Sequence, residues 1–143
     1  TAMAGQYSGV KIYGEQRGSA AGDFDADGRV DLLVAQAGAE TRLLHNETAK
    51  PGLRVRLQGP PGNPRGIGAV VWLLFGTKSG AARELHGGSG YWSQDSAVLV
   101  LATPEPPTGL CVRWPGGKLT AVELPPGAAE VSVGPEGKVQ KLH

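Results

Sequence analysis

Apolar and polar residues alternate with a period of two along much of the second half of the chain. The clearest runs are residues 53–57, 110–114 and 131–133. Successive side chains of a strand point to opposite faces of its sheet, so this period predicts half-buried β-strands. Residues 98–101 are apolar throughout and predict a strand that is covered on both faces.

Glycine and proline separate these runs and predict tight turns. Residues 115–117 and 135–137 each predict a hairpin loop, and residues 76–80 predict a third. No amphipathic helix is evident, since the best stretch, residues 35–44, is interrupted by Gly38. We therefore predict an all-β fold, an antiparallel β-sandwich or barrel-like domain, with a β-hairpin near the N-terminus.

Composition limits the classes of function. The 143 residues include 23 glycines and 11 prolines, and the net charge is +1. No basic stripe favours nucleic-acid binding, and no apolar run is long enough for a membrane span, so neither partner is expected. The single cysteine, Cys111, lies in an apolar run and excludes an intrachain disulfide. A boundary near residues 49–52 predicts two segments, residues 1–50 and residues 51–143.

The first of these segments contains an acidic loop. Four aspartates stand at loop positions 1, 3, 5 and 9, namely Asp23, Asp25, Asp27 and Asp31. So many carboxylates in nine residues repel one another unless a cation neutralises them, and calcium prefers oxygen ligands. Gly28 permits the sharp turn, and Arg29 offers its backbone carbonyl. The spacing predicts one calcium ion. The alternatives are a solvated acidic turn or magnesium, which prefers to keep its own waters.

The calcium loop differs from an EF-hand. Position 12 is Val34 rather than a bidentate glutamate, and residues 30–34 predict a strand rather than a helix. The hairpin is therefore predicted to be a strand–loop–strand site whose last carboxylate comes from Asp31. Extracellular calcium modules of low affinity saturate at about 10⁻⁴–10⁻³ M, which favours an extracellular setting.

Residues 17–34 resemble one FG-GAP/VCBS repeat, in which each repeat is a propeller blade with a calcium loop of this kind. The resemblance implies that the metal ligands are Asp23, Asp25, Asp27, Asp31 and the carbonyl of Arg29. A single blade cannot close a propeller and leaves an open strand edge, which invites pairing with another chain. A monomer or a strand-swapped dimer is therefore expected.

The remainder resembles the ASPIC and UnbV domain, which follows such propellers in bacterial secreted proteins and in cartilage acidic protein. The matching pieces are residues 65–69, 88–94 and 112–117. The sequence departs from the family at residues 97–100, where Ala-Val-Leu-Val replaces a His-Phe-Gly-Leu-like strand. The resemblance implies a secreted or cell-surface protein with a role in adhesion or matrix interaction. It implies no catalytic reaction, so we do not expect an enzyme.

Two other segments suggest chemistry. Residues 59–68 are rich in glycine but lack the Gly-Lys-Ser/Thr ending of a phosphate loop, so a strand connection is the better interpretation. His86, Ser89 or Ser93, and Asp95 suggest a hydrolase triad, but Tyr91 occupies the position where a nucleophile elbow needs glycine.

Tyr91 and Trp92 are candidates for ligand binding. Aromatic residues flanked by Gly, Ser and Gln are typical of surfaces that bind sugars or proteins. The alternative is that both rings fill a core or a corner, as we expect for Trp72 and Trp114 inside strand runs. His45 has no obvious metal partner and is interpreted as a surface residue. The sequence thus favours a calcium-binding extracellular module for adhesion, scaffolding or protein interaction. A carbohydrate-binding module that uses Tyr91 and Trp92 is the alternative.

Overall fold

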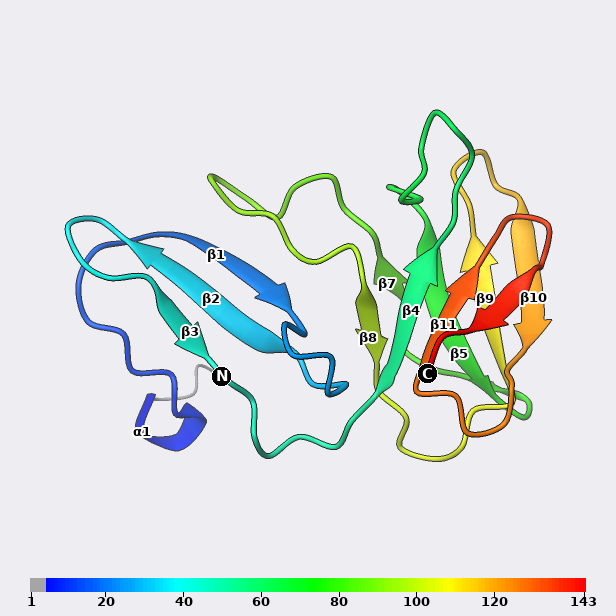
Figure 1. Cartoon of the computed structure of the whole chain (residues 1–143), viewed down its shortest axis with the longest axis horizontal. Helices are drawn as coiled ribbons and strands as arrows, with labels where there is room; N and C mark the ends of the chain where they lie inside the picture. The colour runs from blue at the N-terminus through cyan, green and yellow to red at the C-terminus, as the bar shows by residue number, and fades with distance from the viewer. Residues whose placement is uncertain (1–4) are drawn as a thin grey trace.

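The computed structural model describes residues 5–143, and the regular secondary structure of these residues is almost entirely β-strand (Figure 1). A four-residue helix, α1 (Gly5–Ser8), precedes the strands. The strands are β1 (Gln16–Gly22), β2 (Asp31–Gln36), β3 (Arg42–Leu44), β4 (Leu53–Leu57), β5 (Val70–Phe75), β6 (Lys78–Ser79), β7 (Arg83–Glu84), β8 (Leu99–Leu101), β9 (Gly109–Arg113), β10 (Leu119–Glu123), β11 (Glu130–Val133) and β12 (Val139–Lys141). No helix among the described residues is long and apolar enough to cross a membrane.

The strands form three sheets. The N-terminal sheet is antiparallel, in the order β1–β2–β3. The other two sheets have the orders β12–β11–β4–β8 and β10–β9–β5–β6, with β7 also paired to β5. Within residues 5–143 neither of them closes into a barrel, so the sandwich is the correct alternative. The pairing is antiparallel except between β4 and β11, which run parallel.

The core lies between the two larger sheets and follows from the alternation in the sequence. One face of β4 contributes Leu53, Val55 and Leu57, and the opposite sheet contributes Leu73 and Leu110. Full burial of each such side chain stabilises the fold by about 1.5–3 kcal/mol. The indole of Trp114 is buried at one end of this core and donates through Nε1 to the Thr120 hydroxyl at 2.9 Å.

The three predicted hairpins are present. Between β9 and β10 the Trp114 amide donates to the Lys118 carbonyl at 2.8 Å, and Gly116 and Gly117 have φ of 88° and 90°. Between β11 and β12 the Gly134 amide donates to the Lys138 carbonyl at 3.0 Å. Strands β5 and β6 form the third hairpin. Glycine fits such turns because the left-handed backbone region strains residues that have a Cβ atom.

Three details differ from the prediction. Strand β8 is an edge strand, and of residues 98–101 only Leu101 is fully buried, because no strand of the described residues lies beyond this edge. Trp72 is half-buried rather than a core residue. Arg54 is buried, although the alternation predicts that it points into solvent.

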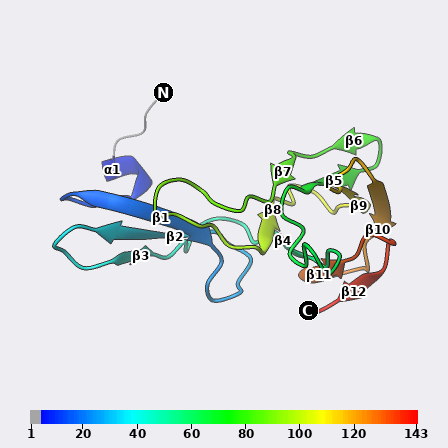
Figure 2. The same cartoon turned by 90° about the horizontal axis from the view of Figure 1, so that it is seen from above.

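The N-terminal sheet lies beside the sandwich, to which residues 45–52 connect it (Figure 1). The connection between β7 and β8 reaches over β1, as Figure 2 shows from above. Its backbone and side chains bind the outer edge of β1. The Ser93 hydroxyl accepts from the Ser19 amide at 3.0 Å, and Asp95 Oδ1 accepts from the Ala21 amide at 2.8 Å. The first four residues of the predicted N-terminal segment lie outside the described residues.

Candidate metal site

The acidic loop connects β1 to β2, and its own carboxylates fold it. Asp23 Oδ1 accepts from the Asp27 amide at 3.1 Å, and Asp23 Oδ2 accepts from the Gly28 amide at 2.8 Å. Gly28 and Ala26 have φ of 84° and 65°, which gives the sharp turn that the sequence predicts at Gly28. The strand–loop–strand geometry of the prediction is confirmed, since β2 begins at Asp31 directly after the loop.

Asp31 connects the loop to the segment that follows β3. This side chain is almost fully buried, and it accepts from the Phe24 amide at 3.2 Å through Oδ2 and from the Asn46 amide at 2.8 Å through Oδ1. Both carboxylate oxygens of Asp31 thus accept hydrogen bonds from backbone amides. Asp31 therefore fastens the base of the loop to the segment that follows β3.

Three of the predicted ligands come together. One carboxylate oxygen from each of Asp23, Asp25 and Asp31 lies within 4.8 Å of the others. Calcium–oxygen distances of about 2.3–2.6 Å put two ligands of one ion at most about 5 Å apart, so this spacing suits a single ion. The donor set is all oxygen, which fits a hard cation such as calcium. The residues present therefore fit the ion that the spacing predicts.

Asp27 and Arg29 bind each other in the second half of the loop. Asp27 accepts from the Arg29 amide at 2.8 Å and forms an ion pair with the Arg29 guanidinium. Burial alone would raise the pKa of Asp27, but the hydrogen bonds and the charge of Arg29, with a smaller contribution from His45, lower it below the ordinary value. Arg29 Nε also donates to the Ala49 carbonyl at 2.7 Å. Its own carbonyl stays a predicted ligand.

His45 lies at the surface, as interpreted, but it joins the acidic cluster, although the sequence shows no metal partner for it. Its Nε2 lies 3.1 Å from Asp25 Oδ2 and 3.8 Å from Asp27 Oδ2, and these three residues form a second group whose ligand atoms lie within 4.8 Å. The Phe24 ring contacts the His45 ring edge to face at 5.7 Å between centroids. Histidine at this point follows β3, fourteen residues beyond Asp31, so local spacing gives no sign of it.

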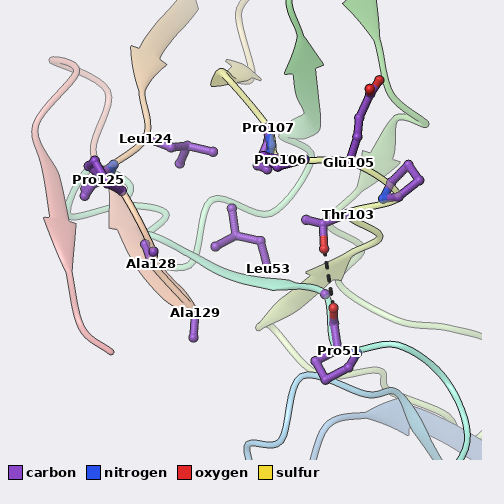
Figure 3. A pocket seen from close by; sticks show the side chains of 14 residues that line it. Pro51, Leu53, Thr103, Glu105, Pro106, Pro107, Leu124, Pro125, Ala128 and Ala129 are labelled. Carbon is purple, nitrogen blue, oxygen red and sulfur yellow. Dashed lines mark hydrogen bonds between the residues drawn. The ribbon is translucent and has the colours of Figure 1, made fainter.

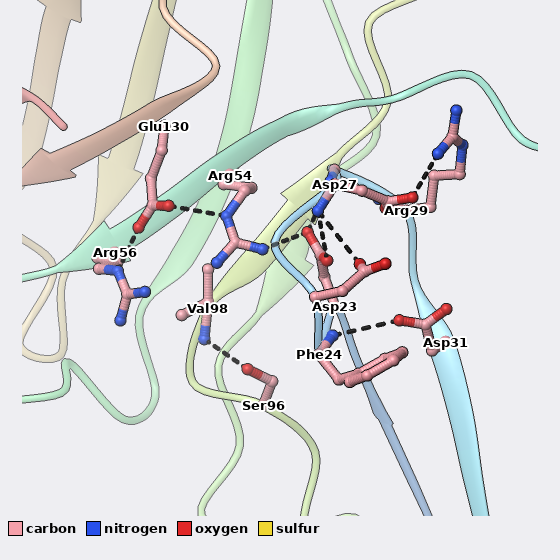
Figure 4. Close-up of polar contacts among 12 residues, drawn as sticks. Asp23, Phe24, Asp27, Arg29, Asp31, Arg54, Arg56, Ser96, Val98 and Glu130 are labelled. Atoms are coloured by element: carbon pink, nitrogen blue, oxygen red, sulfur yellow. Dashed lines mark hydrogen bonds and ion pairs between the residues drawn. The ribbon is translucent and has the colours of Figure 1, made fainter. Parts of the chain in front are cut away.

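A buried ionic network joins the loop to the sandwich (Figure 4). The Arg54 guanidinium donates from Nη1 to Asp23 Oδ2 and from Nε to Glu130 Oε2, the latter at 2.8 Å. The Asp23 side chain is completely buried, and Arg54 and Glu130 are 5% and 4% exposed. Arg56, at the partly exposed end of the network, donates to Glu130 Oε1.

The network shifts the pKa values of Arg54 and Glu130 in the stabilising direction. Burial alone would lower the pKa of Arg54, but its hydrogen bonds and charge contacts with Glu130 and Asp23 raise it above the ordinary value. Burial alone would raise the pKa of Glu130, but Arg54 and Arg56 lower it. Arg54 and Glu130 are therefore held in their charged forms because their partners are charged.

Residues 59–140 match the family described as ASPIC and UnbV. The match covers more than half of the 143 residues. The chain belongs to the ASPIC and UnbV family. Among curated proteins no significant match to the chain is found. The predicted resemblance to the ASPIC and UnbV domain is thus confirmed for residues 59–140. These residues span most of the sandwich, from the β4–β5 connection onward.

The ASPIC and UnbV match includes the loop with the two candidate ligand-binding aromatics. Tyr91 and Trp92 are 77% and 83% exposed, so the interpretation that they fill a core or corner is wrong. Their rings meet edge to face at 6.0 Å between centroids. Trp92 has φ of 54°, and a Cβ at Gly18 would lie 2.6 Å from the Trp92 carbonyl oxygen. The loop thus rests closely on β1 while both rings stay in solvent.

The ASPIC and UnbV domain does not bring the suggested hydrolase groups together. The Ser93 hydroxyl donates to the Tyr91 carbonyl at 3.0 Å, and the Ser89 hydroxyl accepts from the Asp95 amide at 2.8 Å. His86 Nδ1 lies 3.7 Å from a Glu84 oxygen instead. Both serine hydroxyls therefore have structural partners.

The glycine-rich loop of the ASPIC and UnbV domain is a strand connection, as predicted. Asn63 Oδ1 accepts from the Ile67 amide at 2.9 Å, and its Nδ2 donates to the Ile67 carbonyl at 2.8 Å. The backbone amides of Gly59 and Gly66 donate within the same loop, to the carbonyls of Pro64 and Asn63. These donors are used internally and do not form an open phosphate cradle.

A groove of about 630 Å³ lies at the base of the ASPIC and UnbV domain (Figure 3). Its walls are rich in proline and come from residues 103–107 on one side and 124–129 on the other. Among the described residues that line it, Glu105 is the one titratable side chain.

Proposed function

We propose that the chain is a calcium-stabilised extracellular module, built from an FG-GAP/VCBS-like repeat in residues 1–50 and the ASPIC and UnbV domain, and that it serves adhesion, scaffolding or protein interaction rather than catalysis. The observation that carries the proposal is the approach of Asp23, Asp25 and Asp31 oxygens to within 4.8 Å of one another. Asp27 and the Arg29 carbonyl complete the proposed ligand set. Low-affinity calcium sites of this kind suit extracellular calcium, which supports the location.

Calcium would stabilise the loop by relieving repulsion between aspartates that the backbone holds together. An ion that binds only the folded state adds RT ln(1 + [Ca²⁺]/Kd) to the free energy of unfolding, which is about 2.7 kcal/mol at one hundred times Kd. For a chain of this size that free energy raises the Tm by roughly 5–10 °C. Calcium in the environment would thereby control how stably the N-terminal sheet is folded.

Asp25→Ala is expected to abolish the calcium-dependent rise in Tm. Asp25 belongs to both carboxylate groups and is partly exposed, so its removal disturbs the fold less than the removal of buried Asp23. Thermal unfolding is measured by circular dichroism in EDTA, in millimolar calcium and in millimolar magnesium. The control Glu15→Ala removes an exposed carboxylate that pairs with Arg17 beside the same sheet. This variant is expected to keep the calcium-dependent rise in Tm. A calcium shift of equal size in Asp25→Ala would disprove the site.

A second candidate function, carbohydrate binding, is favoured by the rigid presentation of Tyr91 and Trp92. Exposed aromatic rings on a loop that is hydrogen-bonded to β1 lose little conformational entropy when a ligand stacks on them. The positive φ of Trp92 supports a functional role, because strained backbone is concentrated at binding sites.

Trp92→Ala is expected to abolish glycan binding on an array, with an affinity loss of at least about 2 kcal/mol, as for other interface hot spots. The control Leu119→Ala removes a side chain that is 65% exposed on β10 and is expected to bind as the parent does. Retention of glycan binding by Trp92→Ala, or its absence from the parent protein, would contradict this candidate function and leave the calcium proposal intact.

A further inference from the structure

Arg54 occupies an unusual place for an arginine on a strand. Leu53, Val55 and Leu57 of β4 point into the core, so Arg54 lies on the outer face of its sheet. It is nevertheless buried, because the acidic loop covers that face and puts the Asp23 carboxylate on its guanidinium (Figure 4). The side chain is therefore a buried polar contact between the loop and the sandwich.

The guanidinium holds two buried carboxylates at once. It binds Asp23 of the loop and Glu130 of β11, and Arg54 and Glu130 are direct neighbours in the parallel β4–β11 register. A guanidinium is a planar fork, so the position of one carboxylate restricts the position of the other. A buried charge that loses its partner is strongly destabilising, so Asp23 cannot leave the network without disturbing β4 and β11.

This network connects the proposed calcium ligands to strands that make no contact with the ion. Without calcium the aspartates of the loop repel one another, and that repulsion opposes the position of Asp23 on Arg54. With calcium the loop is held, and Asp23 stays on the guanidinium. A change in the position of Asp23 therefore affects Glu130 through the Arg54 side chain, which binds both.

We propose that Arg54 is a positioning residue of the calcium loop and couples calcium binding to the stability of the β4–β11 half of the sandwich. The inference rests on the proposed calcium function and names the route by which the ion acts beyond its own loop. Coupling of this kind between two sites usually corresponds to a change of about 5–150-fold in an equilibrium constant.

A second route between the N-terminal sheet and the sandwich exists and serves as the alternative. The Ser96 amide donates to the Ala21 carbonyl at 2.8 Å, and the Gly52 amide donates to the Gly28 carbonyl at 2.8 Å. These backbone bonds do not involve Arg54. If they carried the coupling, substitution of Arg54 would leave it unchanged.

Hydrogen exchange of the full chain, followed by mass spectrometry, tests the proposal. Exchange is compared in EDTA and at calcium concentrations that calorimetric titration shows to saturate each protein. The segments of interest are the loop 23–31, β4 and β11. In the parent protein calcium is expected to slow exchange in all three segments, by about tenfold at β4 and β11.

Two variants separate coupling from folding. Arg54→Lys keeps the positive charge but lacks the planar fork of the guanidinium. Arg54→Met combined with Glu130→Gln removes two of the three buried charges together. The double variant leaves Asp23 with the amide donors of Asp27 and Gly28, so its folding is first checked by circular dichroism. In both variants, calcium is expected to protect the loop while its effect on β4 and β11 falls below about twofold. The control Lys118→Met removes one charge from the exposed pair with Glu136 and is expected to match the parent.

The outcomes are distinguishable. Calcium protection of β4 and β11 that is equal in the parent and in both Arg54 variants would overturn the role of Arg54 and leave the calcium site in place. If calcium protects only the loop in the parent protein, the role of Arg54 is overturned as well, and the calcium site is again left in place. Absence of calcium binding and of any calcium effect in the parent would instead overturn the proposed function, and the inference with it.

Discussion

Glu130→Ala is expected to lower the free energy of unfolding by about 3–5 kcal/mol, the usual cost of removing one partner from a buried ion pair. Glu130 accepts from both Arg54 and Arg56 and is 4% exposed. Its removal leaves the buried Arg54 guanidinium with Asp23 alone. The loss is measured by urea unfolding at neutral pH in EDTA, so that calcium does not contribute.

The matched control is Glu136→Ala, which removes a carboxylate from the exposed pair with Lys118. Exposed ion pairs contribute little because solvent screens them, so its unfolding curve is expected to overlie that of the parent. An effect of Glu130→Ala as small as that of the control would show that the network contributes nothing to folding.

The difference between the parent and Glu130→Ala is also expected to depend on pH. Burial alone would raise the pKa of Glu130, but hydrogen bonds and charges of Arg54 and Arg56 lower it in the folded protein. The folded state then binds fewer protons than the unfolded state, so this stabilisation is complete above the unfolded pKa of about 4.3. It is lost as the pH falls through the lower folded pKa, and the two unfolding curves should approach each other there.

The strands of the sandwich could be predicted because their signals are local. Alternation in residues 53–57 and 110–114 follows from one buried and one outer face, and the turn at residues 115–117 needs glycine for its backbone angles. The parallel pairing of β4 with β11 could not be predicted. Strands that pair across more than seventy residues leave no trace in the sequence of either one.

For the candidate metal site, too, only the part that is local in sequence could be predicted. The aspartates of the loop are close in sequence, so their spacing indicated that they gather. His45 and Glu130 reach the loop and its network from other elements, and nothing near them in the sequence marks them. Arg54 was misplaced because alternation reports which face of a strand a residue takes, and not whether another segment covers that face.

Leu110→Ala is expected to lower the free energy of unfolding by about 2–5 kcal/mol while leaving the calcium-dependent gain in stability unchanged. Leu110 is fully buried on β9, in the sheet that does not carry Arg54, and its loss leaves a cavity between the two sheets. Distant sites without shared partners contribute additively, so the calcium increment should be that of the parent.

The control for Leu110→Ala is Leu119→Ala, on the neighbouring strand β10, where the side chain is 65% exposed. Both variants are compared with the parent by urea unfolding in EDTA and in saturating calcium. A calcium increment that disappears in Leu110→Ala would mean that the ion acts through the whole core. In that case any destabilising substitution would abolish the response, and the loss expected for the Arg54 variants would no longer identify the buried ionic network as the route.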